Sequence, residues 1–554
     1  MKLTSKTINY TVDTVAQLLL TTGTENDTVI VTDENQGGVF IYREDNSSTN
    51  NGGTIFNGWT RQYDGAVNVK WFGAKGDGVT DDTLAIQNAL DLKSETYVEA
   101  GNYLISDTVI VYQGCILRGA GSGNYDIQGS ETRIITTFIV KSNTTNVGVE
   151  GKDKANLYDF KVIPENVAAV PYYMANYPSD TGNAQTGVVL RASGYISNVT
   201  VQGFSAYGFY LETTCRMENC NAYLCNYGAF LDGADGWVSS SCFMFCATYG
   251  TYANGNYWRY TSNRYEWNAR VGLSSGGEAN IVGNLFDRNG GPGVHLRSGA
   301  WGQVVTGNYF SRNGAGGDGT IGRWGFSTPS HPSYIYTDPK NSCHIQIDYQ
   351  RQITITGNRY RSGQDDALQG ALSPCYIYSS IEASGATSSY SVVGNAGEQG
   401  FDGKGYNSSM YSNIGAIAGG TDTALSYVLN NTRFDVDVVN TNTSIGVGNT
   451  IVTQKGLSIK NSLPYPANTF SIDFPVGMAG KVTISSRAWN STNIGHVYFD
   501  ATAINTGHTT AITNLIGTAI STAVFSVKDS TTNTLTITLN GSYYIVYSVE
   551  SLTW

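Results

Sequence analysis

The strongest constraint on the fold is a repeat of about 22 residues in the middle of the chain. Each repeat opens on a small polar residue before a short apolar segment, and consecutive openers lie 21, 22, 22, 21, 24 and 50 residues apart. The last interval is one coil with an insertion at 314–341. A unit this short cannot bury a core alone, so the repeat predicts a solenoid. The openers are Asn198, Asn219, Ser241, Asn263, Asn284, Asn308 and Asn358.

The residues around each opener indicate the type of solenoid. About ten residues after an opener, a glycine begins an apolar segment, as in 208–211 and 228–231. Two or three short strands per period with glycine at the corners predict a parallel β-helix, and the leucine-rich-repeat pattern is missing. The opening amides are expected to face inward and to form a hydrogen-bonded ladder. The residue two after each opener is also expected inside: Thr200, Asn221, Phe243, Tyr265, Phe286, Phe310 and Tyr360.

Three parts follow from the change of pattern along the chain. Residues 1–65 form a small N-terminal unit, with a helix near 14–20 and a strand at 28–32. Residues 66–405 form the β-helix. Residues 406–554 lose the period and alternate between apolar and polar, which predicts a C-terminal antiparallel β-sandwich.

A short helix is expected between the first two parts, where it covers the open end of the solenoid. Thr80 or Asp81 is the predicted N-cap, and Leu84, Ala85, Ala89 and Leu90 form its apolar face. The nearby carboxylates of Asp77, Asp81 and Asp82 are interpreted as turn and cap residues rather than a metal site.

Composition excludes several classes of function. The net charge is −11, with 33 Lys and Arg against 44 Asp and Glu, which argues against a nucleic-acid surface. No apolar run approaches the roughly 20 residues of a membrane span, and the start of the chain lacks the apolar stretch of a secretory signal. Eight cysteines show no metal-binding spacing, so we expect buried free thiols from a reducing cytosol. No cofactor or metal is predicted.

The segment Trp71-Phe-Gly-Ala-Lys-Gly-Asp-Gly-Val-Thr-Asp-Asp82 resembles the opening of the pectate-lyase-3-type right-handed β-helix of phage tailspikes and capsule depolymerases. Residues 103–106 and 117–121 are similar to the first coils of that family. The resemblance implies a homotrimer that is folded in the bacterial cytoplasm, becomes part of the virion tail, and attaches through its N-terminus to the phage tail or to another tailspike. It also implies binding, and usually cleavage, of capsular polysaccharide or O-antigen.

The outward-facing column three residues after each opener contains the candidate catalytic pair. It is expected to read Val201, Ala222, Met244, Glu266, Asp287, Ser311 and Arg361, so Glu266 and Asp287 lie on consecutive coils of a solvent-exposed wall. Adjacent strands are about 4.8 Å apart, and such a carboxylate pair suits retaining glycoside hydrolysis. Trp267 and Tyr309 are candidates for sugar stacking. The further substrate-binding candidates are Arg264, Arg288, Arg312 and His295.

Other interpretations stay open. The two carboxylates suit a solvated ladder with Arg264 and Arg288 as well as they suit catalysis. Asp365 and Asp366 are candidates for an inter-subunit site, and His331 and His344 are expected to be structural. A polysaccharide lyase with a Tyr or His base and a non-catalytic adhesin compete with the hydrolase. The remaining acidic candidates are Glu218, Asp232, Asp235 and Glu278.

Overall fold

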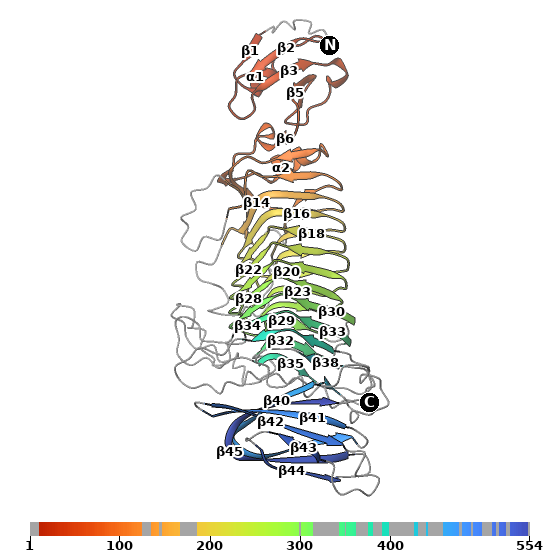
Figure 1. The fold of residues 1–554 in the computed structure, drawn as a ribbon. Helices are drawn as coiled ribbons and strands as arrows, with labels where there is room; N and C mark the ends of the chain where they lie inside the picture. Colours follow the sequence, from red (N-terminus) through yellow and green to blue (C-terminus); the bar gives the residue numbers. More distant parts are fainter. Residues whose placement is uncertain are drawn as a thin grey trace.

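A computed structural model of the chain describes residues 10–123, 135–142, 147–166, 185–297 and 301–313, and separate strands and short segments between 343 and 551. The molecule is elongated (Figure 1): a small sheet lies at the N-terminal end, stacked coils fill the middle, and an antiparallel sheet lies at the other end. The architecture is therefore all-β with few helices.

The N-terminal unit is a five-stranded sheet with one helix. The order is β1-β2-β3-β5-β4, and only the β1–β2 pairing is parallel. Trp59, Phe40 and Leu18 are buried in its own hydrophobic core. The predicted helix and strand are both present. The elements are β1 (Tyr10–Val12), α1 (Val15–Leu19), β2 (Thr28–Val31), β3 (Gly38–Tyr42), η1 (Glu44–Asn46), β4 (Ile55–Phe56) and β5 (Trp59–Gln62).

The expected helix follows as α2 (Thr83–Leu90), and its Ile86, Ala89 and Leu90 join the solenoid core. The predicted N-cap is wrong by one or two residues. Asp82 is the N-cap, and its carboxylate accepts bonds from the backbone of Lys75 and Gly76 instead of from the helix. Asp77 accepts from the Val79 and Thr80 amides, as a turn residue does. The elements before α2 are β6 (Val67–Asn68), η2 (Val69–Phe72) and β7 (Asp77–Asp81).

The coils that follow stack three parallel strips of strands, numbered in chain order within one coil. The long strands β14 (Asn156–Pro164) and β16 (Tyr195–Gln202) serve strips 1 and 2 together. Strip 1 also contains β8 (Glu95–Tyr97), β11 (Ile116–Arg118), β18 (Arg216–Glu218), β21 (Trp237–Ser239), β24 (Trp258–Thr261), β27 (Ala279–Val282), β30 (Trp301–Thr306), β33 (Arg351–Thr356), β36 (Tyr390–Val393) and β38 (Ser426–Leu429).

Strips 2 and 3 complete each coil. Strip 2 contains β9 (Gly101–Ile105), β12 (Thr136–Val140), β19 (Asn221–Tyr223), β22 (Cys242–Met244), β25 (Arg264–Glu266), β28 (Leu285–Asp287), β31 (Tyr309–Ser311), β34 (Arg359–Arg361) and β37 (Ala396–Gly397). Strip 3 contains β10 (Val109–Val111), β13 (Val147–Gly151), β15 (Thr186–Leu190), β17 (Tyr207–Leu211), β20 (Tyr227–Leu231), β23 (Tyr249–Ala253), β26 (Val271–Ser275), β29 (Val294–Leu296), β32 (Cys343–Asp348) and β35 (Cys375–Ser380).

Aromatic rings stack through the core along the axis. Phe243, Tyr265, Phe286, Phe310 and Tyr360 are fully buried, and successive ring centroids lie 4.9–5.2 Å apart with nearly parallel planes. This confirms the inward position predicted two residues after each of these openers. Each coil repeats the backbone of the previous coil at the spacing of adjacent strands. Rings at equivalent positions of successive coils therefore stack on one another.

Two early members of the repeat are out of register with the prediction. The residues in the core are Val201 and Ala222, not Thr200 and Asn221. Asn198 and Asn219 have φ values of 54° and 52°, so they form left-handed corners one residue before the ladder position. Asparagine tolerates this conformation almost as glycine does, which is why it occurs at both kinds of position.

The amide ladder itself is present. The Oδ1 atoms of Asn284, Asn308, Asn358 and Asn395 each accept the backbone N–H of the ladder residue one coil earlier, at 2.8–3.0 Å. A second ladder at the next corner was not predicted. There the Oδ1 atom of Asn268 accepts the Cys246 N–H, and Asn289 and Asn313 continue the series. In the sequence, this second ladder is marked by an asparagine five residues after each of the openers Asn263, Asn284 and Asn308.

The glycines of strip 3 are strand residues and not the corners that the sequence suggested. A Cβ atom on Gly228 would lie 2.4 Å from the carbonyl oxygen of Gly250, and Gly208 has the same relation to Gly228 at 2.6 Å. The glycines therefore permit close approach of adjacent coils rather than a turn.

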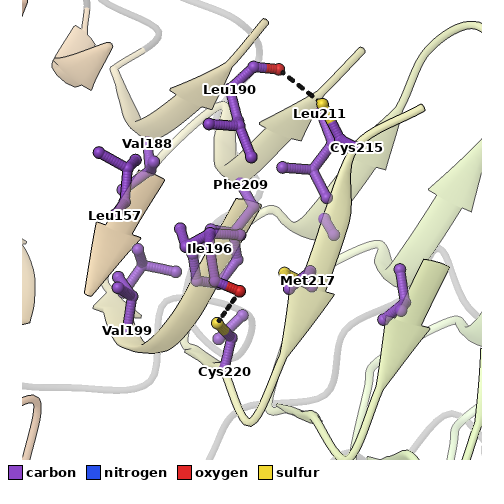
Figure 2. Close-up of a cluster of buried hydrophobic side chains, with 14 of the residues drawn as sticks. Leu157, Val188, Leu190, Ile196, Val199, Phe209, Leu211, Cys215, Met217 and Cys220 are labelled. Atoms are coloured by element: carbon purple, nitrogen blue, oxygen red, sulfur yellow. Dashed lines mark hydrogen bonds between the residues drawn. The ribbon is translucent and has the colours of Figure 1, made fainter. Parts of the chain in front are cut away.

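The buried thiols pack between the coils as small apolar groups. Figure 2 shows Cys215 and Cys220 among Leu190, Ile196 and Met217, with each sulfur directed at a backbone carbonyl. Cys115, Cys215, Cys220, Cys225 and Cys246 are buried free thiols, and Cys242 is a less buried one.

The described strands of the C-terminal part form a six-stranded antiparallel sheet. A second layer, which a sandwich requires, stays a prediction. The strands are β40 (Ser458–Pro475), β41 (Ala479–Ala488), β42 (Ser491–Asp500), β43 (Ile512–Ile516), β44 (Ile520–Val527) and β45 (Thr532–Ser551), and a short β39 (Val439–Asn440) precedes them.

Candidate active site

Glu266 and Asp287 end the strands β25 and β28 of strip 2. Their neighbours Tyr265 and Phe286 belong to the core stack, so the carboxylates point to the outer face. The register pairs Glu266 with Asp287, as the repeat predicts, and places Met244 before them and Ser311 after them. The two earliest residues of this column are Gln202 and Tyr223 rather than Val201 and Ala222, because of the corner shift described above.

The pair is sheltered, which corrects the expectation of a solvent-exposed wall. Glu266 is 3% exposed and Asp287 is 6% exposed. An outer apolar cluster accounts for part of this shelter. Met244, on the rung before Glu266, and Trp267 both pack against the buried side chains of that cluster, which are Tyr223, Leu224, Phe245 and Ala247.

Three arginines surround the two carboxylates. Arg264 contacts Glu266 Oε2, and Arg312 binds Asp287 with Nε 2.9 Å from Oδ1 and a second nitrogen on Oδ2. Arg288 bridges the pair: its Nη1 atom lies 2.8 Å from Asp287 Oδ2 and 3.6 Å from Glu266 Oε1. A buried charge pair is stable only when its partners are close and satisfied. Asp287 meets that condition through hydrogen bonds from Arg288 and Arg312, whereas Glu266 Oε2 is buried with an arginine in contact but no well-formed hydrogen bond.

The backbone brings two of these arginines over the pair. Arg288 and Arg312 directly follow their strands in left-handed conformation, each with a φ of 54°. The left-handed residue turns the chain from strip 2 into strip 3. Trp267 holds the same corner one coil before Arg288, so the corner column combines a ring and two guanidinium groups.

The surroundings act differently on the two acids. Burial raises the pKa of Glu266 above its usual range, and the charge of Asp287 raises it further, while Arg264 and Arg288 oppose the change. Asp287 has two guanidinium groups within hydrogen-bonding range. The raised pKa makes Glu266 a candidate proton donor.

The two aromatic candidates are already in contact with neighbours. The Trp267 ring stacks on Phe245 of the preceding coil, with ring centroids 6.0 Å apart. The guanidinium of Arg288, on the following coil, lies 4.7 Å from the centre of the Trp267 ring. Tyr309 points outward from β31, and the Arg359 guanidinium lies 5.7 Å from its ring centre. A sugar can reach the edge of Trp267 but not a free face.

His295 lies on strip 3, so the structure does not bring it into the carboxylate column. Its Nε2 atom is 2.6 Å from Asp348 Oδ2, and Gln346 donates to the other oxygen of Asp348 at 3.0 Å. His295 and Gln346 are register partners on β29 and β32. The partnership with Asp348 was not predicted, because the long insertion hides the spacing between these two strands.

The other acidic candidates are spread over different strips. Glu218 accepts a hydrogen bond from Tyr195, and Asp232 accepts one from Tyr210, both at 2.8 Å. Asp235 and Glu278 line a cavity on strip 1. The candidates Asp365, Asp366 and His331, and the insertion 314–341, lie outside the described residues.

His344 is fully buried beside Phe310 and Tyr360, at ring distances of 6.0 and 5.8 Å. Burial lowers the pKa of His344 to about 3, so the ring is neutral at physiological pH. This position is structural, as expected. Among the described residues, no group of three or more His, Cys, Asp or Glu side chains is arranged to hold a metal ion. The described helices are all too short or too polar to cross a membrane.

Comparison with known proteins bears on the fold of the chain. Residues 66–163 match the family model "Rhamnogalacturonase A/epimerase, pectate lyase-like", and residues 186–325 match the model of the right-handed β-helix region. The chain contains a pectate-lyase-like right-handed β-helix. The fold is also similar to that of tailspike protein 2 of bacteriophage CBA120, with a TM-score of 0.56, 16% identity, and coverage of 98% of this chain and 82% of that one.

Curated relatives match parts of this β-helix chain. The pre-neck appendage protein of Bacillus phage phi29 is 29% identical over 115 residues, which cover 16% of this chain and 14% of the relative. The mannuronan C5-epimerase AlgE6 of Azotobacter vinelandii is 31% identical over 195 residues, or 31% of this chain and 20% of the relative. The chain thus spans a fifth or less of the length of these relatives.

Proposed function

We propose that the chain is a phage tailspike that binds bacterial surface polysaccharide and cleaves it by endo-glycosidic hydrolysis. The observation that carries the proposal is the pair Glu266 and Asp287, adjacent on the outer face and bridged by Arg288. The fold of a tailspike and the sequence matches to a phage appendage protein and a mannuronan epimerase support the biological setting. The substrate is a capsule or an O-antigen.

In this mechanism the two acids have separate roles. Glu266, with its raised pKa, donates a proton to the glycosidic oxygen while Asp287 attacks the anomeric carbon and forms a glycosyl-enzyme. The leaving chain departs as an alcohol. Glu266 then takes a proton from water, and the hydroxyl replaces Asp287 on the sugar.

The contacts of Arg288 limit the separation of the two acids. Distances of 2.8 and 3.6 Å from one nitrogen keep Asp287 Oδ2 and Glu266 Oε1 within about 6.4 Å. Retaining enzymes hold their carboxyl groups about 5–5.5 Å apart and inverting enzymes about 6.5–9.5 Å. This upper limit for the two facing oxygen atoms lies below the inverting range, which supports the retaining mechanism within this proposal.

Substrate reaches the pair when an arginine moves. The Arg264 side chain is 53% exposed, whereas those of Arg288 and Arg312 are 12% and 9% exposed. Arg264 is the partner that an incoming sugar displaces most easily, and its guanidinium is then free to bind an acidic substituent or a hydroxyl.

The remaining assignments belong to the same proposal. Three chains assemble as a homotrimer, and residues 406–554 hold the trimer together. Residues 1–65 attach it to the phage tail or to another tailspike. Residues 66–405 bind and cleave the glycan. The chain is made in the host cytoplasm and acts at the bacterial surface as part of the virion tail.

Amide variants of each acid test the catalytic assignment. Glu266→Gln and Asp287→Asn are each expected to lower depolymerisation of host polysaccharide by at least about 100-fold, because each removes a chemical role. Products of the native protein should be saturated oligosaccharides with new reducing ends. Glu150→Gln is the matched control: Glu150 is another buried outward glutamate bound by an arginine, Arg191, but on strip 3. Full activity in both site variants would refute the assignment.

A uronate-directed lyase is the second candidate, favoured by the epimerase match and by the His295–Asp348 pair. There His295 would take the C5 proton as the C4 substituent leaves, which forms a double bond in the product. Unsaturated products that are lost in His295→Gln but retained in Glu266→Gln would replace the hydrolase by the lyase. Unchanged polymer length after long incubation would identify an adhesin.

A further inference from the structure

A hollow lies on the outer face of strip 1, away from the strip that carries the carboxylate pair. One cavity of about 350 Å³ is lined by Tyr257, Glu278 and Asn280, among others, and an adjoining one of about 1020 Å³ by Tyr195 and Glu218. Asp235 and Trp237 line both cavities. The two are therefore one groove along the axis, here called the strip 1 groove.

The floor of the strip 1 groove is a register column. Tyr195, Arg216, Trp237, Arg259 and Asn280 occupy equivalent positions on five consecutive rungs. At about 4.8 Å a rung the column extends over roughly 19 Å, long enough for several linked sugar rings. The Arg216 and Arg259 guanidinium groups lie 4.4 and 5.0 Å from the Trp237 ring centre, which fixes both arginines along the floor.

Tyr257 stands at the edge of this groove in a conformation that a bulky residue rarely adopts. Its φ is 60°, and it is 54% exposed. Neither burial nor the corner requires an aromatic side chain, since Lys154 and Ser193 hold the same kind of left-handed corner with small or charged side chains. The Tyr257 hydroxyl hydrogen-bonds Glu278 at the groove, which leaves the exposed ring in this strained conformation as a candidate for ligand contact.

Charge distinguishes the strip 1 groove from the carboxylate pair. The groove has three carboxylates, Glu218, Asp235 and Glu278, against the two guanidinium groups fixed on Trp237. The carboxylate pair has the opposite balance, with three arginines around two acids. A net negative groove repels uronates, whereas its carboxylates accept hydrogen bonds from sugar hydroxyls.

We propose that the strip 1 groove is a second glycan-binding site, which holds a neutral oligosaccharide segment with one pyranose ring against Tyr257. Carboxylates of Asp235 and Glu278 accept hydroxyl hydrogen bonds, and Arg259 and Asn280 donate them. The site requires no catalytic residue and binds whether or not Glu266 and Asp287 cleave the chain.

Binding to an array of bacterial capsular and O-antigen polysaccharides of known composition tests the site. The full chain carrying Glu266→Gln is used, so that retention is measured without cleavage. We expect binding to neutral polysaccharides, and a loss of affinity of about tenfold or more in Tyr257→Gly with no loss of thermal stability, because glycine relaxes the left-handed residue. Glu278→Gln, which preserves shape, is expected to weaken binding as well.

Lys154→Gly is the matched control, since Lys154 is an exposed left-handed corner outside the groove. It should leave glycan binding unchanged. Equal binding by Tyr257→Gly and the parent, binding confined to uronate-containing polysaccharides, or no retention on the array would each overturn the proposal. None of these outcomes bears on hydrolysis, which is measured separately with the native pair.

Discussion

Glu266 and Glu150 show how the same residue type receives different properties on one solenoid. Both are outward-facing, nearly buried and bound by arginine. Burial raises the pKa of each, but hydrogen bonds from Lys152 and Arg191 outweigh it and lower the pKa of Glu150. At Glu266 burial prevails, and Asp287 adds to it. Burial that the neighbouring arginines do not offset, with the charge of Asp287 added to it, therefore separates a candidate acid from a structural ion pair.

The raised pKa of Glu266 predicts a pH dependence. Activity that needs a protonated Glu266 should fall as pH rises through this raised pKa. Arg264→Met removes a positive charge that lowers the pKa, so the basic limb of the pH–rate profile should move to higher pH. Arg191→Met, which acts on Glu150, should leave the limb in place. A limb that stays fixed or moves to lower pH in Arg264→Met would contradict the role of Glu266.

His344 predicts acid sensitivity of the fold. Its pKa is lowered to about 3 in the fold and lies near 6.5 in an unfolded chain, so its stabilising effect is complete above pH 6.5 and is lost as pH falls toward 3. The free energy of unfolding should fall by about 1.4 kcal/mol per pH unit in this range from this group alone. In His344→Leu that component should disappear in denaturant unfolding measured between pH 6.5 and 4. An unchanged slope would mean that His344 titrates freely.

The corners, rather than the strands, set the register of the coils. The strands of strip 2 are three residues long in six of the described coils, too short to fix pairing by themselves. Buried amides make up for this, because each ladder asparagine is bonded to the coil before it and to the coil after it. The Asn284 side chain accepts from the Asn263 N–H and donates to the Tyr260 carbonyl, both in the preceding coil. The Asn284 N–H in turn donates to Oδ1 of Asn308 in the next coil.

Removal of one ladder amide should therefore destabilise the stack. Asn284→Ala leaves a buried donor on Asn263 and a buried acceptor on Tyr260, at about 1–3 kcal/mol for each unsatisfied group. Asn219→Gly is the control, because Asn219 is an exposed left-handed corner outside the ladder. Thermal unfolding should show a clear loss for the first variant and little change for the second. Equal effects would mean that the ladder contributes nothing specific.

The same corners explain which parts of the structure could be predicted. The 22-residue period gave the fold, the aromatic stack and the pairing of Glu266 with Asp287, since these depend only on spacing. It could not distinguish an asparagine in a ladder from one in a left-handed corner, so Asn198 and Asn219 were misplaced. Burial of the carboxylates depends on side chains from adjacent corners, such as Arg312, whose direction a linear pattern does not contain.

The whole molecule is a stack in which each coil contacts mainly its neighbours, so its core is long and narrow. Stacked aromatic rings fill one part of this core, and small thiols fill part of the remainder. Cys215, Cys220, Cys225 and Cys246 lie in one run of coils, each hydrogen-bonded to a backbone carbonyl of the same or an adjacent coil. A tailspike exposed to oxygen outside the cell would need such thiols to be unreactive.

Burial makes these cysteine thiols unreactive. It raises the pKa of Cys215 to about 11 and those of Cys220, Cys225 and Cys242 to about 12, so almost no thiolate exists at pH 8. We expect these thiols to resist a thiol-specific disulfide reagent in the native protein and to react fully once denaturant unfolds the stack. Cys242 is less buried in the fold than the other three thiols, so Cys242→Ser is the control variant for a thiol that the reagent reaches in the native protein. If Cys242→Ser removed a rapid native phase, that thiol would be accessible; if the other thiols reacted rapidly in that variant, the coils would open locally without unfolding.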